Sequence, residues 1–291
     1  GMFSFAIYDS KKSLIFIARD RLGIKPLYYF QNDQKFIFGS EIKAILEYKS
    51  IVPTPNIKKM YAHNYFSMDL QTHINEVMEQ EPGTFSVVKF NGKIQIQTTK
   101  YWNLNLKQNN DSEDHVIEKL SNLLDESSSI HLRSDVPVGL MLSGGVDSNI
   151  VGYFGNKNYK SQFNSFTFGN AEKGLNEFDA TDLTSKEVFN SKQRNVYLNF
   201  DDILTTIPKV MKSLEVSEPR IFESSLATYL LMKEVKKHNK VILCGEGADE
   251  LFGGYPGFFA SKDKSDLLKE YQRHYCGGLY RLQLKRLDKI T

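Results

Sequence analysis

The feature that most restricts the fold of this chain is a pair of apolar segments, each of which runs directly into a glycine-rich, acidic loop. Val138–Leu142 precedes the loop Ser143–Ser148, and Val241–Leu243 precedes the loop Cys244–Tyr255. Strand-like and helix-like patterns alternate around these segments, which is typical of a mostly parallel sheet with helices on both faces. Because ligands bind such sheets beyond the carboxyl ends of the strands, we expect both loops to lie at a binding site.

The second half of the chain is expected to alternate between helices and strands. Apolar residues recur at helical spacing from Val116 to Ile130, after Ser112, a residue type that caps helix N-termini. Short apolar runs bounded by polar turns indicate strands. The pattern predicts helices at 116–130, 176–189 and 225–237, and strands at 138–142, 163–168, 195–199 and 241–244.

The first half has a different pattern, in which apolar and polar residues alternate between polar turns. A period of two predicts antiparallel strands, and Asn91-Gly92 is a strong hairpin signal between two of them. A polar stretch at 103–114 marks a domain boundary, which gives an α+β domain over 1–104 and an α/β domain over 105–291. The expected elements are strands at 3–8, 14–18, 28–30, 35–38, 84–90 and 94–101, and one short helix at 41–47.

Composition excludes several classes of protein. The length of 291 residues suits about two domains, and 41% hydrophobic with 25% charged residues is an ordinary globular mixture. A net charge of +2 does not favour nucleic acid or an anionic membrane as a partner, and no apolar run approaches the roughly 20 residues of a membrane helix. Six histidines and two cysteines show neither metal-binding spacing nor a disulfide framework, which suits the reducing cytoplasm.

The loop Ser143–Ser148 has the composition of a phosphate-binding turn between a strand and a helix. Gly144 and Gly145 allow close approach to the backbone, and successive N–H groups at a helix N-terminus attract anions. No lysine follows the glycines, so the loop is not a Walker A motif. Asp147 would repel a bare phosphate, so phosphate binding at this loop requires a cation such as Mg²⁺. A plain glycine turn with Asp147 capping the helix is the open alternative.

The loop Cys244–Tyr255 places three acidic residues among four glycines, a poor composition for a core or a helix. Such a loop suits a metal–nucleotide complex, and an exposed acidic turn is the alternative. Two independent loops at strand ends, one able to cradle phosphate and both carrying carboxylates, favour a shared binding site over either alternative.

These motifs resemble the synthetase domain of glutamine-dependent asparagine synthetases, which has the ATP-pyrophosphatase (PP-loop) α/β fold. The resemblance includes SGGVDS, with Ser134–Gly139 before it, and GEGADELFGGY, and the combination is highly specific. Upstream, Gly1–Phe3 and Ala18–Tyr29 are similar to the later part of the family's N-terminal-nucleophile (Ntn) glutaminase domain, which is α+β. Within that remnant, Arg19-Asp20 is expected to form a structural turn and not a catalytic site.

The resemblance implies ATP-dependent amidation of aspartate. In that family ATP activates the aspartate side chain as a β-aspartyl-adenylate and releases pyrophosphate, and ammonia from glutamine hydrolysis attacks the adenylate. The implied substrates are aspartate, glutamine and ATP, and the implied metal is Mg²⁺. The enzyme is expected in the cytoplasm, and the resemblance is compatible with a homodimer. Position by position, the resemblance assigns ATP binding to Leu142, Ser143, Gly144, Gly145, Asp147, Ser148, Phe168, Cys244 and Gly245, Mg²⁺ binding to Asp147 and Asp249, and proton acceptance from the attacking ammonia to Glu246.

Several features depart from the family pattern. Cys244 stands where the family usually has serine, and a thiol is a weaker hydrogen-bond donor than a hydroxyl. Phe168 is bulkier than the usual aliphatic residue at its position. The chain begins with Gly1 and not with the family's N-terminal cysteine, and Arg286–Lys289 resembles only the start of the C-terminal region. We therefore expect a fragment of a longer enzyme that cannot by itself hydrolyse glutamine.

Two other functions stay open at this point. A related amidotransferase could act on another carboxylate or on a sugar in cell-surface polysaccharide synthesis. A non-catalytic nucleotide-binding relative would share the fold, and Cys244 is the motif feature that points toward it.

Overall fold

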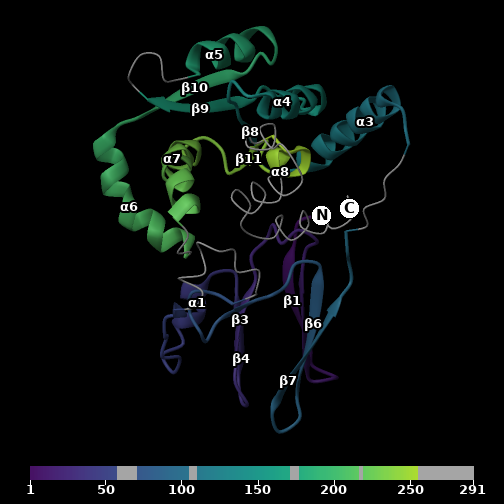
Figure 1. Ribbon diagram of the computed structural model, residues 1–291, viewed down its shortest axis with the longest axis vertical. Coiled ribbons are helices and arrows are strands. Elements are labelled where there is room, and N and C mark those ends of the chain that lie inside the picture. Colours follow the sequence, from purple (N-terminus) through teal and green to yellow (C-terminus); the bar gives the residue numbers. More distant parts are fainter. Residues whose placement is uncertain (58–70, 105–109, 171–176, 216–218, 255–291) are drawn as a thin grey trace, which may run out of the picture. The chain divides into compact units, whose positions relative to one another are not determined.

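The computed structural model describes residues 1–57, 71–104, 110–170, 177–215 and 219–254 (Figure 1). The chain divides into two compact units: the first contains Gly1–Lys107, and the second contains Gln108–Ser213 and Pro219–Gly253. The stretch 255–291, which includes Arg286–Lys289, lies outside the described residues.

The first unit contains a four-stranded antiparallel sheet with the strand order β1-β2-β6-β7. Aromatic side chains line one side of it, where the ring of Phe16 stacks on Phe5 at 6.1 Å and on Phe85 at 5.1 Å between centroids. The predicted hairpin is confirmed at Gly92, whose φ of +77° is the left-handed conformation that glycine adopts without strain. The strands are β1 (Ser4–Asp9), β2 (Leu14–Arg19), β6 (Thr84–Phe90) and β7 (Ile94–Lys100).

A second, three-stranded antiparallel sheet of this unit has the order β4-β3-β5. Ile42 and Ile45 of the short helix α1 pack with Val77 into a buried cluster over this sheet. The antiparallel α+β architecture predicted for this half is confirmed, although β5 is too short for a sequence period to reveal. The elements are β3 (Tyr28–Gln31), β4 (Phe36–Gly39), β5 (Met78–Glu79) and α1 (Ile42–Leu46).

The second unit is built on a four-stranded sheet with the order β10-β9-β8-β11, in which every neighbouring pair is parallel. The predicted parallel sheet is confirmed. The chain leaves β8 toward β9 and β10 on one side and later returns to place β11 on the other side of β8. The strand order therefore reverses between β8 and β11. The strands are β8 (Val138–Met141), β9 (Asn164–Asn170), β10 (Lys192–Leu198) and β11 (Val241–Leu243).

Helices cover both faces of this sheet, as two successive residues of β8 show. Leu140 belongs to a buried cluster that includes Phe189 and is covered by Val151 of α4. Met141 points to the opposite face and packs with Leu231 of α7. The helices of this unit are α3 (Glu113–His131), α4 (Val146–Asn158), α5 (Phe178–Glu187), α6 (Phe200–Leu214), α7 (Pro219–Val235) and α8 (Ala248–Phe252).

Two elements begin earlier than the sequence predicts. The strand β10 begins at Lys192, and not at 195, because pairing with β9 recruits three polar residues that carry no apolar pattern. Helix α7 begins at Pro219 and not at 225; proline is well suited to the first position of a helix, where its missing N–H is not needed.

Sequence reasoning made no prediction for residues 200–214, where α6 forms. Pro208 lies inside this helix, and proline ordinarily argues against a helix interior. Two other observations explain why the helix forms: Asn199 Oδ1 accepts the Asp202 N–H at 2.8 Å as an N-terminal cap, and Thr206 and Val210 are buried four residues apart. Among the described residues, none of the helices is long and apolar enough to cross a membrane.

Candidate active site

The topology of the second unit brings its two glycine-rich loops together. Because β8 and β11 are adjacent and parallel, the loops that follow them start at the same edge of the sheet. A β-carbon at Gly245 would lie 3.0 Å from both the backbone carbonyl carbon of Asp147 and the nitrogen of Ser148. Only glycine permits this approach. The two loops therefore contact one another at the point of strand-order reversal, where open parallel sheets bind their ligands.

The loop after β8 is held by its own side chains. Ser148 is 9% exposed, and its Oγ accepts the Ser143 N–H at 3.0 Å and lies 2.8 Å from the Ser143 Oγ. Asn149 Nδ2 donates to the carbonyl oxygens of Ser143, at 3.0 Å, and Gly145, at 2.7 Å. The Ser148 hydroxyl thus braces the loop in this structure. A role for Asn149 was not predicted from the sequence. The available signal was its side-chain amide, which directly follows the last residue of the SGGVDS motif.

The end of β8 is fixed by its neighbour β9. Leu142 is 2% exposed; its N–H donates to the Phe166 carbonyl at 3.0 Å, and its carbonyl accepts the Thr167 hydroxyl at 2.7 Å. Phe168, the residue after Thr167, is 40% exposed. Both residues are among those predicted to bind ATP; Leu142 is therefore buried beside the sheet, and Phe168 presents an apolar ring at its surface. Thr167 was not predicted, because a buried threonine in a strand carries no motif.

Acidic residues of the second loop influence one another and the first loop. Loss of hydration on burial, followed by the negative charges of Asp147 and Glu250, raises the pKa of Asp249. Although Glu246 is exposed as a residue, desolvation of its carboxyl and the charges of Glu250 and Asp249 raise its pKa as well. The carboxylates of Asp147 and Asp249, about one hundred residues apart in sequence, are thus close enough to repel each other.

This carboxylate pair fits a divalent cation better than it fits an isolated acidic turn. A cation between Asp147 and Asp249 would remove their repulsion, and carboxylate oxygens are ligands that Mg²⁺ prefers. Within the described ranges, no group of three or more His, Cys, Asp or Glu residues is arranged to hold a metal ion. Two protein carboxylates are sufficient when the remaining ligands are water and phosphate oxygens, the usual arrangement for Mg²⁺.

Cys244 joins β11 to the acidic loop and carries a free thiol. Burial raises the pKa of this thiol, and the negative charge of Glu246 raises it further. The Glu246 backbone N–H, which donates to the sulfur, has the opposite but smaller effect. The thiol is therefore held in its neutral form, in which it is a weak donor and not a nucleophile. Gly247, with φ of +96°, and Gly253, with φ of +73°, then start and end the short helix α8 in left-handed conformations.

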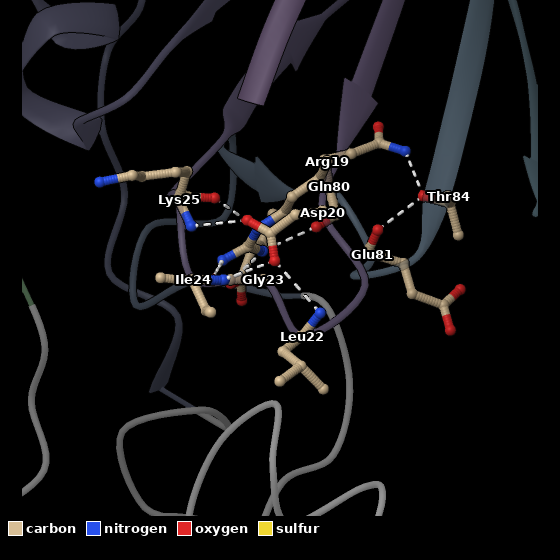
Figure 2. A network of polar contacts seen from close by, with 10 residues as sticks. Arg19, Asp20, Leu22, Gly23, Ile24, Lys25, Gln80, Glu81 and Thr84 are labelled. Carbon is tan, nitrogen blue, oxygen red and sulfur yellow. Dashed lines mark hydrogen bonds and ion pairs between the residues drawn. The ribbon is translucent and has the colours of Figure 1, made fainter. Parts of the chain in front are cut away.

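The turn at Arg19-Asp20 in the first unit has a different character. The Asp20 carboxylate accepts the backbone N–H groups of Phe3, Leu22, Ile24 and Lys25 at 2.9–3.2 Å, and Figure 2 shows it pointing into the turn. Arg19 donates to the carbonyl oxygens of Gly23, Lys25 and Gln80 and pairs with Glu79. Both residues are at most 5% exposed. These contacts support the structural role predicted for this pair.

Comparison with known proteins gives one family match in each half of the chain. Residues 119–289 match the family model described as asparagine synthase, and residues 1–102 match the model described as a glutamine amidotransferase domain.

Curated relatives agree with these matches. The chain is 31% identical to asparagine synthetase [glutamine-hydrolyzing] 1 of Bacillus subtilis, over 88% of this chain and 40% of that protein. It is 34% identical to putative asparagine synthetase [glutamine-hydrolyzing] 2 of Methanocaldococcus jannaschii, over 88% of this chain and 50% of the relative. The chain thus spans about half the length, or less, of these relatives.

Among solved structures, the NH3-dependent NAD synthetase of Campylobacter jejuni is 17% identical to this chain. The match covers 47% of this chain and 60% of the synthetase chain, with a TM-score of 0.35.

Proposed function

Because the chain belongs to the asparagine synthase family, we propose that the protein of which it is part converts aspartate to asparagine, with ATP as the activating substrate and glutamine as the source of nitrogen. The reaction proceeds through a β-aspartyl-adenylate, whose formation releases pyrophosphate. The observation that carries this proposal is the contact between the two strand-end loops, in which Gly245 lies against Asp147 and the charge of Asp147 raises the pKa of Asp249.

The first loop supplies the phosphate contacts. The backbone N–H of Gly144 and the N-terminus of α4 face the pyrophosphate part of ATP, where they stabilise the negative charge that develops on the leaving group. Ser148 keeps these groups in place through its bonds to Ser143. The adenosine part lies toward Leu142 and Phe168, and Cys244 and Gly245 close the nucleotide site from the second loop.

Asp147 and Asp249 hold Mg²⁺ in this proposal. When bound, the ion supplies charge neutralisation at the phosphate oxygens as the leaving group departs. The two carboxylates come from different loops, so binding of the ion also ties the loops together. Their mutual repulsion, which raises the pKa of Asp249, supports this assignment.

Glu246 accepts the proton that the attacking ammonia loses. A carboxylate whose pKa is raised by burial and by neighbouring negative charges is a stronger base than an ordinary glutamate. Its position three residues after the end of β11, beside the nucleotide loop, suits a group that acts on the adenylate and not on the triphosphate.

The first unit belongs to a glutaminase domain of the Ntn type, which would supply ammonia from glutamine. The match of residues 1–102 to the glutamine amidotransferase model supports this part of the proposal. A chain with two cysteines and no disulfide framework suits the reducing cytoplasm, where we place the enzyme.

The test is pyrophosphate release by the full-length protein. We expect release to require ATP, Mg²⁺ and aspartate together, and asparagine to appear in equal amount when glutamine is added. Pyrophosphate release with another carboxylate or an acidic sugar, but not with aspartate, would show that the acceptor differs from aspartate while the adenylation chemistry is the same. A folded protein that binds no ATP would leave only the non-catalytic alternative.

A further inference from the structure

The backbone N–H of Gly144 is engaged by a side chain from outside its loop. Gly144 N donates to Glu177 Oε2 at 2.7 Å, and a β-carbon at Gly144 would lie 3.3 Å from Glu177 Cδ. The two neighbouring N–H groups are bonded within the loop, since Ser143 N donates to Ser148 Oγ and Gly145 N donates to Ser143 Oγ. Gly144 is therefore the position in Ser143–Gly145 at which another element provides the acceptor.

Glu177 reaches this position from a backbone that is firmly held. It directly precedes α5, and its carbonyl oxygen accepts the Thr181 N–H at 2.9 Å. Thr181 is fully buried and Phe178 is 6% exposed, so the core fixes the start of this helix. The Glu177 carboxylate, by contrast, stands at the end of three rotatable bonds and can turn away without disturbing α5.

A carboxylate and a phosphate compete for the same place here. One N–H has one proton to donate, so two acceptor oxygens cannot both receive a full hydrogen bond from Gly144. Two anions at one donor also repel each other. The partial positive charge at the N-terminus of α4 stabilises whichever anion is present. Binding of a phosphate group at Gly144 thus requires the Glu177 carboxylate to leave.

We propose that Glu177 occupies the phosphate position at Gly144 in the ligand-free protein and is displaced by the pyrophosphate part of ATP. This inference rests on the proposed function, in which Gly144 binds phosphate. Because displacement opposes binding, Glu177 weakens the affinity for free pyrophosphate and speeds its release after the adenylate has formed. Glu177 is therefore a residue that tunes product affinity and not a catalytic residue.

The test is binding of Mg²⁺–pyrophosphate to the full-length protein by titration calorimetry. We expect Glu177→Ala to bind pyrophosphate about tenfold more tightly than wild type, since one charge-assisted hydrogen bond no longer has to be broken. Glu177→Gln keeps an acceptor but loses the charge, and its affinity should lie between the two. Asp179→Ala is the matched control, because it removes a carboxylate from the exposed surface of the same helix turn. Thermal unfolding of each variant shows that the fold is retained.

Each outcome decides the proposal. Tighter binding by the Glu177 variants, with Asp179→Ala within about twofold of wild type, supports it. Weaker binding by Glu177→Ala overturns it and makes Glu177 a residue that assists the ligand. Equal gains in all three variants overturn it in favour of long-range charge. If the Glu177 variants match wild type while ATP still binds, the inference alone is wrong; if neither pyrophosphate nor ATP binds to any folded variant, the proposed function is wrong as well.

Discussion

Two acidic turns of this chain follow directly after a strand, and the protein treats their carboxylates in opposite ways. Asp20 follows β2 in the first unit; burial would raise its pKa, but four backbone N–H donors outweigh that effect and hold the pKa below its ordinary value. Asp249 and Glu246 follow β11 in the second unit, where burial and the charges of neighbouring carboxylates raise both pKa values.

This difference separates a carboxylate that stabilises the fold from carboxylates to which the proposed function assigns a ligand or a proton. The donors around Asp20 come from the chain itself, so its charge is stabilised as soon as the turn forms. The charges of the second loop are instead destabilised by each other, and a bound cation or a transferred proton relieves them. Stability should therefore depend on Asp20, and activity on Asp249 and Glu246.

The largest effect should come from the proposed metal ligands. We expect Asp249→Ala or Asp147→Ala to lower ATP-dependent pyrophosphate release about 1,000-fold in the full-length protein, because charge on the phosphates is no longer neutralised. Steady-state assays at saturating Mg²⁺ measure this. Asp179→Ala, in the same unit, should retain normal release. Activity within threefold of wild type in Asp249→Ala would remove this residue from the metal site.

Loss of the Asp20 carboxylate should instead affect stability. Asp20→Asn leaves backbone N–H groups without a charged acceptor in a buried turn, and we expect the first unit to lose about 3 kcal/mol of unfolding free energy. Denaturant unfolding measures the change. Asp9→Asn is a suitable control, because Asp9 accepts N–H groups of the same kind in an exposed turn. A loss no larger than that of the control would show that the Asp20 turn does not depend on its charge.

Replacement of Glu246 should separate the two half-reactions. In Glu246→Gln we expect amide formation to fall about 100-fold, while aspartate-dependent exchange of pyrophosphate into ATP changes little. In wild type, amide formation should rise with pH as Glu246 loses its proton, and this rise should begin at a higher pH than for an ordinary glutamate, because its pKa is raised. Equal loss of exchange and amide formation would contradict a proton-accepting role.

The same chemical change, Asp to Asn, should have stability effects of opposite sign in the two turns. The lowered pKa of Asp20 means that its contribution is present above the ordinary value of 3.8 and is lost as pH falls through its folded pKa. The raised pKa of Asp249 means that its charge opposes folding at neutral pH, so Asp249→Asn should gain about 0.5 kcal/mol, a gain that disappears as pH falls below the ordinary value of 3.8. Unfolding of both variants at pH 7 and pH 3 checks the signs. Destabilisation by Asp249→Asn at pH 7 would contradict the contrast.

The smallest effect should come from Cys244. Its neutral thiol is a weak donor, so Cys244→Ser should keep ATP affinity or improve it by no more than about threefold. Titration with ATP measures this, and Cys244→Ala should be slightly weaker than wild type. A loss of tenfold or more in Cys244→Ser would show that the sulfur makes a contact that a hydroxyl cannot replace.

Much of the fold was predictable because local sequence patterns specify it. The alternation around Phe5 and the Asn91-Gly92 turn identify the antiparallel half, and the apolar runs at 138–142 and 241–244 identify two strands of the parallel sheet. Helix α6 was not predicted because it contains Pro208, and proline ordinarily argues against a helix interior. The polar start of β10 was not predicted because pairing with β9, and not an apolar pattern, extends that strand.

By itself, the sequence determined which segments become strands and helices and which loops carry glycine and carboxylate, because these properties depend on neighbours within a few residues. Only the tertiary structure decided that β11 lies beside β8, that Gly245 rests on Asp147, and that Glu177 reaches the N–H of Gly144. Strand order and such contacts depend on how distant apolar faces bury each other, and no local period records that choice.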